Sequence, residues 1–223
     1  MIPVDPAPEP SGFDENVRSK GRDWIARQGQ RVITEFPSYW RWCEPQLHEA
    51  FRGRCGWAAM TITSGQIDHF VVSQAECKRE QPERAYDWDN YRYIMPELNS
   101  KKGRRPAVLD PFEVQAGWFE LALPHLHLRS TAAIPASLRE LADATLQGLE
   151  LERGDKLMRL RRKYMLQYRM GKTRIELLDD DFPLLADALR RLFAAQDEEL
   201  GDELRHWRAE LIAARQAANA SVP

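Results

Sequence analysis

Apolar positions in the last third of the chain recur at helical spacing. The segment FPLLADALRRLF places six apolar residues on one face: Leu184, Leu185, Ala188, Leu189, Leu192 and Phe193. A second stripe, at i, i+4, i+7 and i+11, consists of Leu200, Leu204, Trp207 and Leu211. Such intervals predict amphipathic helices that bury one face. We therefore expect helices between residues 136 and 216, within a helical C-terminal region of residues 131–223.

The N-terminal third shows the same periodicity in two shorter segments. Phe13, Val17 and Trp24 lie at helical spacing in a segment that ends near residue 28, and a second helical pattern follows Pro37. Pro45 interrupts the second pattern and is expected to begin a fresh turn there. Both segments are typical of helices that cover a core rather than of functional sites.

The first twelve residues differ from both of these segments. They contain the proline-rich sequence MIPVDPAPEP and lack the basic start and apolar centre of a signal peptide. We therefore expect residues 1–12 to form a flexible tail and the protein to be cytoplasmic. No apolar run approaches the roughly 18 residues that a membrane span requires, so no membrane association is expected.

The middle of the chain, from about residue 54 to residue 130, alternates short β-like runs with turn residues. The runs are WAAMTIT, QIDHFVV, DWDNYRYI and WFELALPHLHL, and the turn-rich segment PELNSKKGRR lies between the last two. Short runs of β-branched and aromatic residues bounded by Pro, Gly and Asn are typical of strands. The expected fold class is therefore α+β, with residues 13–130 forming one domain.

One of these runs carries titratable residues where apolar ones are expected. In QIDHFVVSQ, Asp68 and His69 interrupt a strand-like sequence, although burying both is costly unless each finds a partner. Downstream, Asn90 closes a turn that enters the next strand, Pro96 suits the first turn of a helix, and Asn99 falls on its second turn. This order predicts a ββα unit whose four polar side chains can converge. The Asp-His pair alone is weak support for a site, because histidines are often satisfied within cores.

These residues resemble a known family. The Asp-His pair, the first Asn and the second Asn follow the order and spacing of HNH endonucleases, which have the ββα-metal fold. The closer resemblance is to the HNH nuclease subunit of Septu-type bacterial antiphage systems, and it rests on DHFVVS, AYDWDNYR, NSKKG and LDPFEVQAGWF. It covers roughly residues 51–128. The resemblance implies an HNH nuclease core flanked by N-terminal helices and by the helical C-terminal region.

The chemistry of phosphodiester cleavage and the resemblance together give each polar residue an expected role. His69 is the expected general base, since a histidine near neutral pKa can take a proton from water. Asp68 and Asn99 are the expected ligands of Mg²⁺ or Mn²⁺, because hard cations prefer oxygen donors. By resemblance, Asn90 holds the loop and orients His69, a role compatible with turn capping. Successive strand side chains face opposite sides, so the strand is expected to end or twist at Asp68 and His69.

One departure from the wider HNH pattern removes the expectation of a structural zinc. Many relatives carry two CxxC pairs beside the catalytic unit, whereas Cys55 here has no second cysteine, and Met95 and Leu98 stand where the other pair would be. One thiolate does not hold a tetrahedral zinc. Trp57, Met95 and Leu98 are expected to fill that space with apolar packing.

Basic residues follow the predicted metal ligand directly and recur later in the chain. Lys101, Lys102, Arg104 and Arg105 would suit contact with phosphates, or else form a solvated helix end. Between residues 153 and 174, nine Lys or Arg residues accompany a single Asp. That stretch is compatible with a DNA surface, with docking of an acidic partner, and with an ordinary solvated helix.

The expected function is metal-dependent cleavage of DNA by the effector subunit of a bacterial antiphage complex. The net charge of −2 gives no general support for nucleic-acid binding, so a partner is expected to help bring the substrate. By resemblance this partner is an ABC-type ATPase, and the chain itself lacks the P-loop pattern that binds ATP. Two alternatives remain open: an RNA-directed HNH nuclease, and a non-catalytic adaptor that retains the HNH fold.

Overall fold

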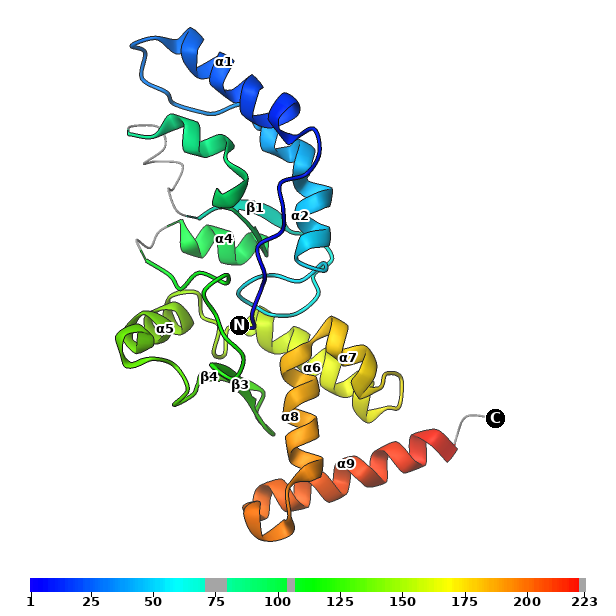
Figure 1. The fold of residues 1–223 in the computed structure, drawn as a ribbon. Coiled ribbons are helices and arrows are strands. Elements are labelled where there is room, and N and C mark those ends of the chain that lie inside the picture. The colour runs from blue at the N-terminus through cyan, green and yellow to red at the C-terminus, as the bar shows by residue number, and fades with distance from the viewer. Residues whose placement is uncertain (71–79, 104–106, 221–223) are drawn as a thin grey trace.

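The computed structural model describes residues 1–70, 80–103 and 107–220. The fold is of the α+β class, as the sequence predicts, and combines helices with two small antiparallel sheets in the described part of the chain. Figure 1 shows an elongated molecule, with α1 (Ser19–Gln28) at one end and α9 (Asp202–Ala220) at the other. The two sheets lie in different halves of this arrangement.

The first half contains a strand–strand–helix unit. β1 (Gln66–His69) pairs antiparallel with β2 (Tyr91–Ile94), and α4 (Pro96–Lys102) packs against β1. Every residue of β2 is buried, so this strand lies within the core. Pro96 lies in the first turn of α4, where its missing N–H leaves no hydrogen bond unmade. The ββα order predicted from the spacing of the polar residues is therefore present.

The N-terminal helices form as their periodicity predicts. A turn of π-helix (Asp14–Arg18) leads into α1, and a 3-10 turn (Tyr39–Cys43) leads into α2 (Glu44–Ala50), which has Pro45 in its first turn. Gly21 allows α1 to pack closely, because a Cβ at that position would lie 2.1 Å from the ring of Tyr86.

Residues 1–12, predicted to form a flexible tail, lie against the rest of the chain. Met1 is only 1% exposed, and Ile2 and Val4 pack against the core. The indole Nε1 of Trp88 donates a hydrogen bond of 2.8 Å to the carbonyl of Ala7. The apolar side chains of this segment are therefore buried despite its high proline content.

The second half is built from helices around a β-hairpin. Its helices are α5 (Ala136–Gly148), α6 (Asp155–Arg169), α7 (Ile175–Asp181), α8 (Pro183–Ala194) and α9. A 3-10 turn at Asp197–Glu199 precedes α9, and two others, at Pro82–Tyr86 and Trp88–Asn90, precede β2 in the first half. The helical character expected between residues 136 and 216 is confirmed. The apolar stripe of α8 is buried as predicted, except that its last residue, Phe193, is only partly buried.

Two of the β-like runs have different outcomes. WFELALPHLHL forms the hairpin of β3 (Phe119–Ala122) and β4 (His127–Ser130), which contacts α8 and α5. WAAMTIT forms only an isolated bridge between Arg54 and Thr61. The hairpin therefore packs with helices from beyond residue 130, although the sequence division at that residue assigns it to the first domain.

Candidate active site

The imidazole of His69 lies at the end of β1 and is held by a backbone carbonyl. Its Nε2 lies 2.9 Å from the carbonyl oxygen of Ala85, which also accepts a hydrogen bond of 2.8 Å from the hydroxyl of Tyr91. Because a carbonyl oxygen only accepts, Nε2 carries the proton and Nδ1 presents a lone pair. Within the described residues, no hydrogen-bond partner of Nδ1 is found.

Aromatic rings surround this imidazole and fix its charge state. The rings of Trp40 and Tyr91 meet it edge to face at centroid distances of 4.6 and 5.3 Å, and His69 is 5% exposed. Burial in this environment lowers the pKa of His69 to about 4, and the nearby charge of Lys102 acts in the same direction. The imidazole is therefore neutral at pH 7, the form that can accept a proton.

Asn90 positions the backbone on both sides of His69. Its side chain is fully buried, and Nδ2 donates a hydrogen bond of 2.9 Å to the carbonyl of Arg84, the residue before Ala85. Its own carbonyl accepts a hydrogen bond of 2.8 Å from the N–H of Phe70, the residue after His69. Asn90 thus ties the segment that holds the imidazole to the end of the strand that carries it.

Asp68 faces a different set of neighbours. The ammonium of Lys102, on α4, lies 3.1 Å from its carboxylate and 3.4 Å from the carbonyl oxygen of His69. Asp68 is 5% exposed, and this burial raises its pKa while the positive charge of Lys102 opposes the rise. Oδ2 of Asp68 lies at ion-pair distance from Lys102 but accepts no hydrogen bond in the described structure.

The structure does not bring the side chains of Asp68 and His69 together. β1 ends at His69, as the sequence predicts, but Asp68 contacts Lys102 on α4 whereas His69 contacts Trp40 and Tyr91. Adjacent residues of a strand point to opposite faces, and this pair follows that rule to its last residue. A metal bound to Asp68 and a water molecule next to His69 would therefore have to meet beyond the end of β1.

Asn99 lies on α4, one turn before Lys102, and faces β1. Its Nδ2 donates a hydrogen bond of 3.1 Å to Oε1 of Gln66, which leaves the amide oxygen of Asn99 for another partner. Both residues border a polar cavity of about 460 Å³. The cavity is also bordered by Glu35, Ser38, Trp40, Arg41 and Glu44. No contact joins Asn99 to Asp68 among the described residues.

The lysines expected to contact phosphate both form ion pairs within the protein. Lys101 pairs with Glu150 on the exposed surface, and Lys102 pairs with Asp68 in the interior. Either must exchange its partner before it binds a phosphate. Arg104 and Arg105 lie outside the described residues.

A buried ion pair that the sequence did not predict lies beside the candidate site. The guanidinium of Arg92, on β2, binds the carboxylate of Asp110 through two hydrogen bonds of 2.7 and 2.6 Å. It also lies over the rings of Phe112 and Phe70, at 3.6 and 4.9 Å from their centroids. Lys102 lies 5.1 Å from the centroid of the same Phe70 ring, so both cations neighbour this ring. Asp110 belongs to the LDPFE motif, but the sequence does not show which cation it meets.

The carboxylate of Asp68 has an oxygen of the kind that binds hard cations. The buried Oδ2 lacks a hydrogen bond, and the group already attracts one positive charge. No cluster of three or more His, Cys, Asp or Glu residues that would form a preassembled metal site is found in the described ranges. Of the two expected ligands, Asp68 offers an oxygen without a hydrogen bond, whereas Asn99 borders the polar cavity and is joined to Asp68 by no contact in the described residues. A metal at Asp68 would take most of its ligands from outside the protein, as Mg²⁺ often does.

The space around Cys55 is packed with apolar side chains. Trp57, Met95 and Leu98 are buried, as expected for residues that fill this space. The sulfur of Cys55 accepts hydrogen bonds from the N–H groups of Ala58 and Met95, at 3.5 and 3.4 Å. Burial raises the pKa of this thiol, which keeps it protonated at neutral pH.

Comparison with known proteins yields no relative: no protein family matches the chain, and no curated protein or solved structure matches it. Among the residues that the structure describes, no helix has the length and apolar character needed to cross a membrane.

Proposed function

We propose that the protein is a metal-dependent endonuclease of the HNH type, which cleaves DNA as the effector subunit of a bacterial antiphage complex. The observation that carries this proposal is the orientation of His69 by the Ala85 carbonyl, next to Asp68 in a strand–strand–helix unit. A neutral imidazole with a fixed tautomer is the arrangement that a general base requires.

The residues around His69 would support proton transfer from water. Nδ1 would accept the proton, while the Ala85 carbonyl stabilises the resulting imidazolium through Nε2. Tyr91 donates to the same carbonyl and packs on the ring, so it limits rotation of the imidazole. Asn90 is a positioning residue, since it fixes the backbone on both sides without contacting the reacting atoms.

Asp68 and Asn99 would hold Mg²⁺ or Mn²⁺. When bound, the cation would stabilise negative charge on the phosphate and on the departing oxygen. Lys102 already neutralises Asp68, so metal binding would weaken or replace this ion pair. A displaced Lys102, together with Lys101, would then be available to contact phosphate oxygens.

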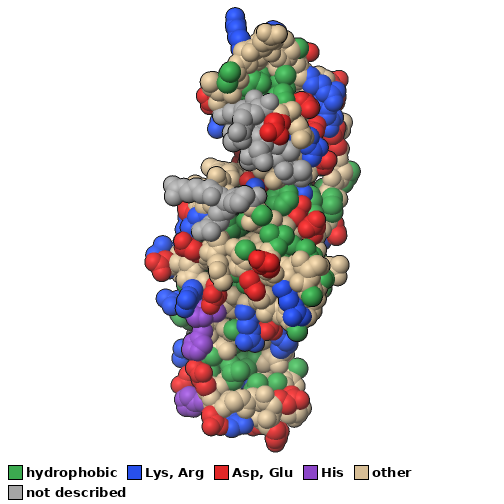
Figure 2. Space-filling model, turned by 90° about the vertical axis from the view of Figure 1, so that its left-hand side faces the viewer, with side chains coloured by type: hydrophobic (Ala, Val, Ile, Leu, Met, Phe, Trp, Pro, Cys, Tyr) green, Lys and Arg blue, Asp and Glu red, His purple; other side chains and the backbone are tan. Residues whose placement is uncertain are grey.

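Substrate recruitment is assigned to a partner. Figure 2 shows Lys and Arg side chains interspersed with Asp and Glu on the face in view, rather than one continuous basic surface. Such a surface binds nucleic acid weakly by charge alone. An ABC-type ATPase subunit is the partner that the sequence resemblance implies. RNA remains an alternative substrate, because the same base and metal would cleave it.

The test is nicking of supercoiled plasmid by the purified protein in Mg²⁺ or Mn²⁺, alone and with the ATPase neighbour. His69→Ala and EDTA should each abolish cleavage, and His206→Ala should not, because His206 is an exposed histidine on α9. Equal cleavage by His69→Ala and by the unaltered protein would refute the assignment of the base. A labelled single-stranded RNA in the same reactions separates the RNA-directed alternative.

The second candidate function is a non-catalytic adaptor that retains the fold. The observation that favours it is the separation of Asp68, paired with Lys102, from the aromatic environment of His69. Absence of DNA and RNA cleavage under every condition, together with stable binding to the ATPase, would favour the adaptor.

A further inference from the structure

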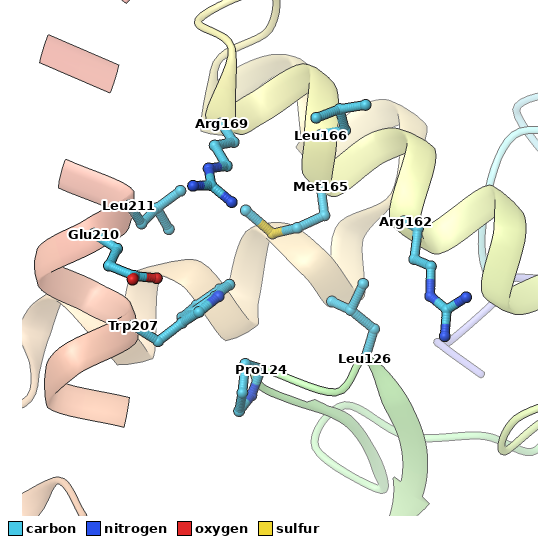
Figure 3. A pocket seen from close by; sticks show the side chains of 9 residues that line it. All are labelled: Pro124, Leu126, Arg162, Met165, Leu166, Arg169, Trp207, Glu210 and Leu211. Atoms are coloured by element: carbon cyan, nitrogen blue, oxygen red, sulfur yellow. The ribbon is translucent and has the colours of Figure 1, made fainter. Parts of the chain in front are cut away.

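A cavity in the second half of the molecule lies far from β1 in the chain and takes no part in the proposed chemistry. It has a volume of about 350 Å³ and lies between α6, α9 and the turn that joins β3 to β4. Its apolar lining consists of Pro124, Leu126, Met165, Leu166, Trp207 and Leu211. Figure 3 shows Met165 reaching from α6 toward Trp207 and Leu211 on α9, with Pro124 and Leu126 on the hairpin side.

The apolar surface continues outside the cavity. Leu166 is 55% exposed and Met170 is 46% exposed, and their spacing of four residues places them on the same face of α6. Leu166 lines the cavity itself, and Met170 follows it at the end of α6. An apolar cavity with exposed apolar side chains beside it is typical of an interaction site.

Two cations border the same surface without partners. Arg162 and Arg169 line the cavity from α6, and neither forms an ion pair or a side-chain hydrogen bond with any residue in the described ranges. Arg215, by contrast, packs over Tyr168 with its guanidinium carbon 4.0 Å from the ring centroid and donates to nearby carbonyls. Arg162 and Arg169 are therefore available for an external anion.

We propose that this cavity is a docking site for an acidic segment of a partner protein, which inserts one aliphatic or aromatic side chain between α6 and α9. The inserted side chain would cover Trp207 and contact Met165, and methionine adapts to side chains of different shape. Carboxylates beside the anchor would pair with Arg162 and Arg169, which present guanidinium groups suited to bidentate binding.

The chemistry of the rim favours a protein segment over a nucleic acid. A phosphate backbone would leave Leu166 and Met170 against polar atoms. A peptide covers both the apolar and the cationic parts of the surface. The recognition mode is that of an amphipathic segment in a groove, with charge setting its orientation.

The experiment uses the full chain and short fluorescein-labelled peptides, with binding followed by fluorescence anisotropy. The first peptide series combines Asp and Glu with one Leu, Phe or Trp anchor. A second series replaces the anchor by Ser, and a third replaces the acids by Lys. Labelled oligothymidylate serves as the nucleic-acid probe. The protein variants are Arg169→Glu, Leu166→Ser and, as the matched control, Arg159→Glu.

Anchored acidic peptides should bind, and loss of the anchor or of the acids should weaken binding about tenfold or more. Arg169→Glu and Leu166→Ser should weaken it to a similar extent. Arg159→Glu makes the same charge change on the same helix about 15 Å from Arg169 along its axis, at a residue that does not line the cavity, so it should weaken binding clearly less than Arg169→Glu does.

Three results would overturn the proposal: no binding by any anchored acidic peptide, equal binding by the anchor-free series, or equal weakening by Arg159→Glu. Tight binding of oligothymidylate that is lost in Arg169→Glu would assign the surface to nucleic acid instead. These results are independent of nuclease activity, because none of the altered residues lies near β1.

Discussion

In the part of the chain that the structure describes, each half of the molecule buries one arginine, and the two arginines have different kinds of partner. Arg92, in the first half, is 3% exposed and binds the carboxylate of Asp110 through two hydrogen bonds. Arg161, in the second half, is 1% exposed and donates to the carbonyls of Leu126, Leu151 and Glu152. No acidic group pairs with Arg161 among the described residues, and burial lowers its pKa to about 10.

The difference separates a structural arginine from one beside a candidate site. The carbonyl oxygens in the β3–β4 turn and in the segment between α5 and α6 need hydrogen-bond donors, and Arg161 joins both segments to α6. Arg92 joins β2 to the LDPFE segment, next to a second buried ion pair of Asp68 and Lys102. Two adjacent buried ion pairs add little net stability, although removal of one partner from either pair is costly.

Arg92→Ala should give the largest loss of stability. It would leave Asp110 buried without its counter-ion and remove the packing between Phe70 and Phe112, so we expect a loss of about 4 kcal/mol. Urea denaturation measures the change. The double variant Arg92→Met with Asp110→Leu removes both charges and should regain more than half of the loss. An equal loss in the single and double variants would show that Arg92 acts through its hydrogen bonds to the carbonyls of Asp89 and Tyr91, which both variants remove, and not through its charge.

Arg161→Ala should come second, with a loss of about 3 kcal/mol, because buried carbonyls would lose their donor. Arg161→Lys should recover only part of this, since one ammonium cannot match the fork of a guanidinium. The neighbouring Arg162→Ala is the control and should leave the urea midpoint unchanged, as Arg162 is exposed. If Arg161→Met were as stable as the unaltered protein, the carbonyls would be satisfied by water and the comparison of the two arginines would fail.

The elements that the sequence predicted are those determined by local spacing. The stripe of α8, the start of α4 at Pro96 and the end of β1 at His69 each depend on a few neighbouring residues. The hairpin in WFELALPHLHL formed while WAAMTIT did not, because a strand requires a partner that its own sequence does not encode.

The partners of charged groups were the part that the sequence did not reveal. Asp68 meets Lys102 across 34 residues, so the lysine expected to bind phosphate instead neutralises the expected metal ligand. The burial of Met1 likewise depends on contacts with distant parts of the chain. The positions of Asp68, His69, Asn90 and Asn99 in a ββα unit followed from the motifs, but which side chains face one another required the fold.

The protonation of His69, in the first half, is expected to make the free energy of unfolding depend on pH. Its pKa is about 4 in the folded protein and 6.5 as the ordinary value, so the unfolded chain binds the proton more tightly. The contribution of neutral His69 to the free energy of unfolding is present above pH 6.5 and is lost as the pH falls toward 4. Between pH 7 and pH 5 the loss is about 2 kcal/mol.

Urea denaturation at several pH values tests this dependence. His69→Gln, which does not titrate, should show a shallower decline of stability between pH 7 and pH 5 than the unaltered protein. Replacement of the exposed His206 by Gln should leave the slope unchanged. Parallel curves for His69→Gln and the unaltered protein would mean that burial does not lower the pKa of the imidazole.

The smallest effect is expected for Lys102→Met, and it probes the proposed metal site directly. Loss of the ammonium leaves Asp68 buried without its partner, but the carboxyl group can take up a proton, which limits the loss to about 1 kcal/mol. Added Mn²⁺ should then raise the melting temperature of the variant more than that of the unaltered protein, because the cation no longer competes with Lys102. Lys101→Met, which removes only the exposed pair with Glu150, is the matched control. If Asp68→Asn combined with Lys102→Met responds to Mn²⁺ as strongly as Lys102→Met alone, the cation binds elsewhere, and the two ion pairs of the first half are structural in the same sense as Arg161.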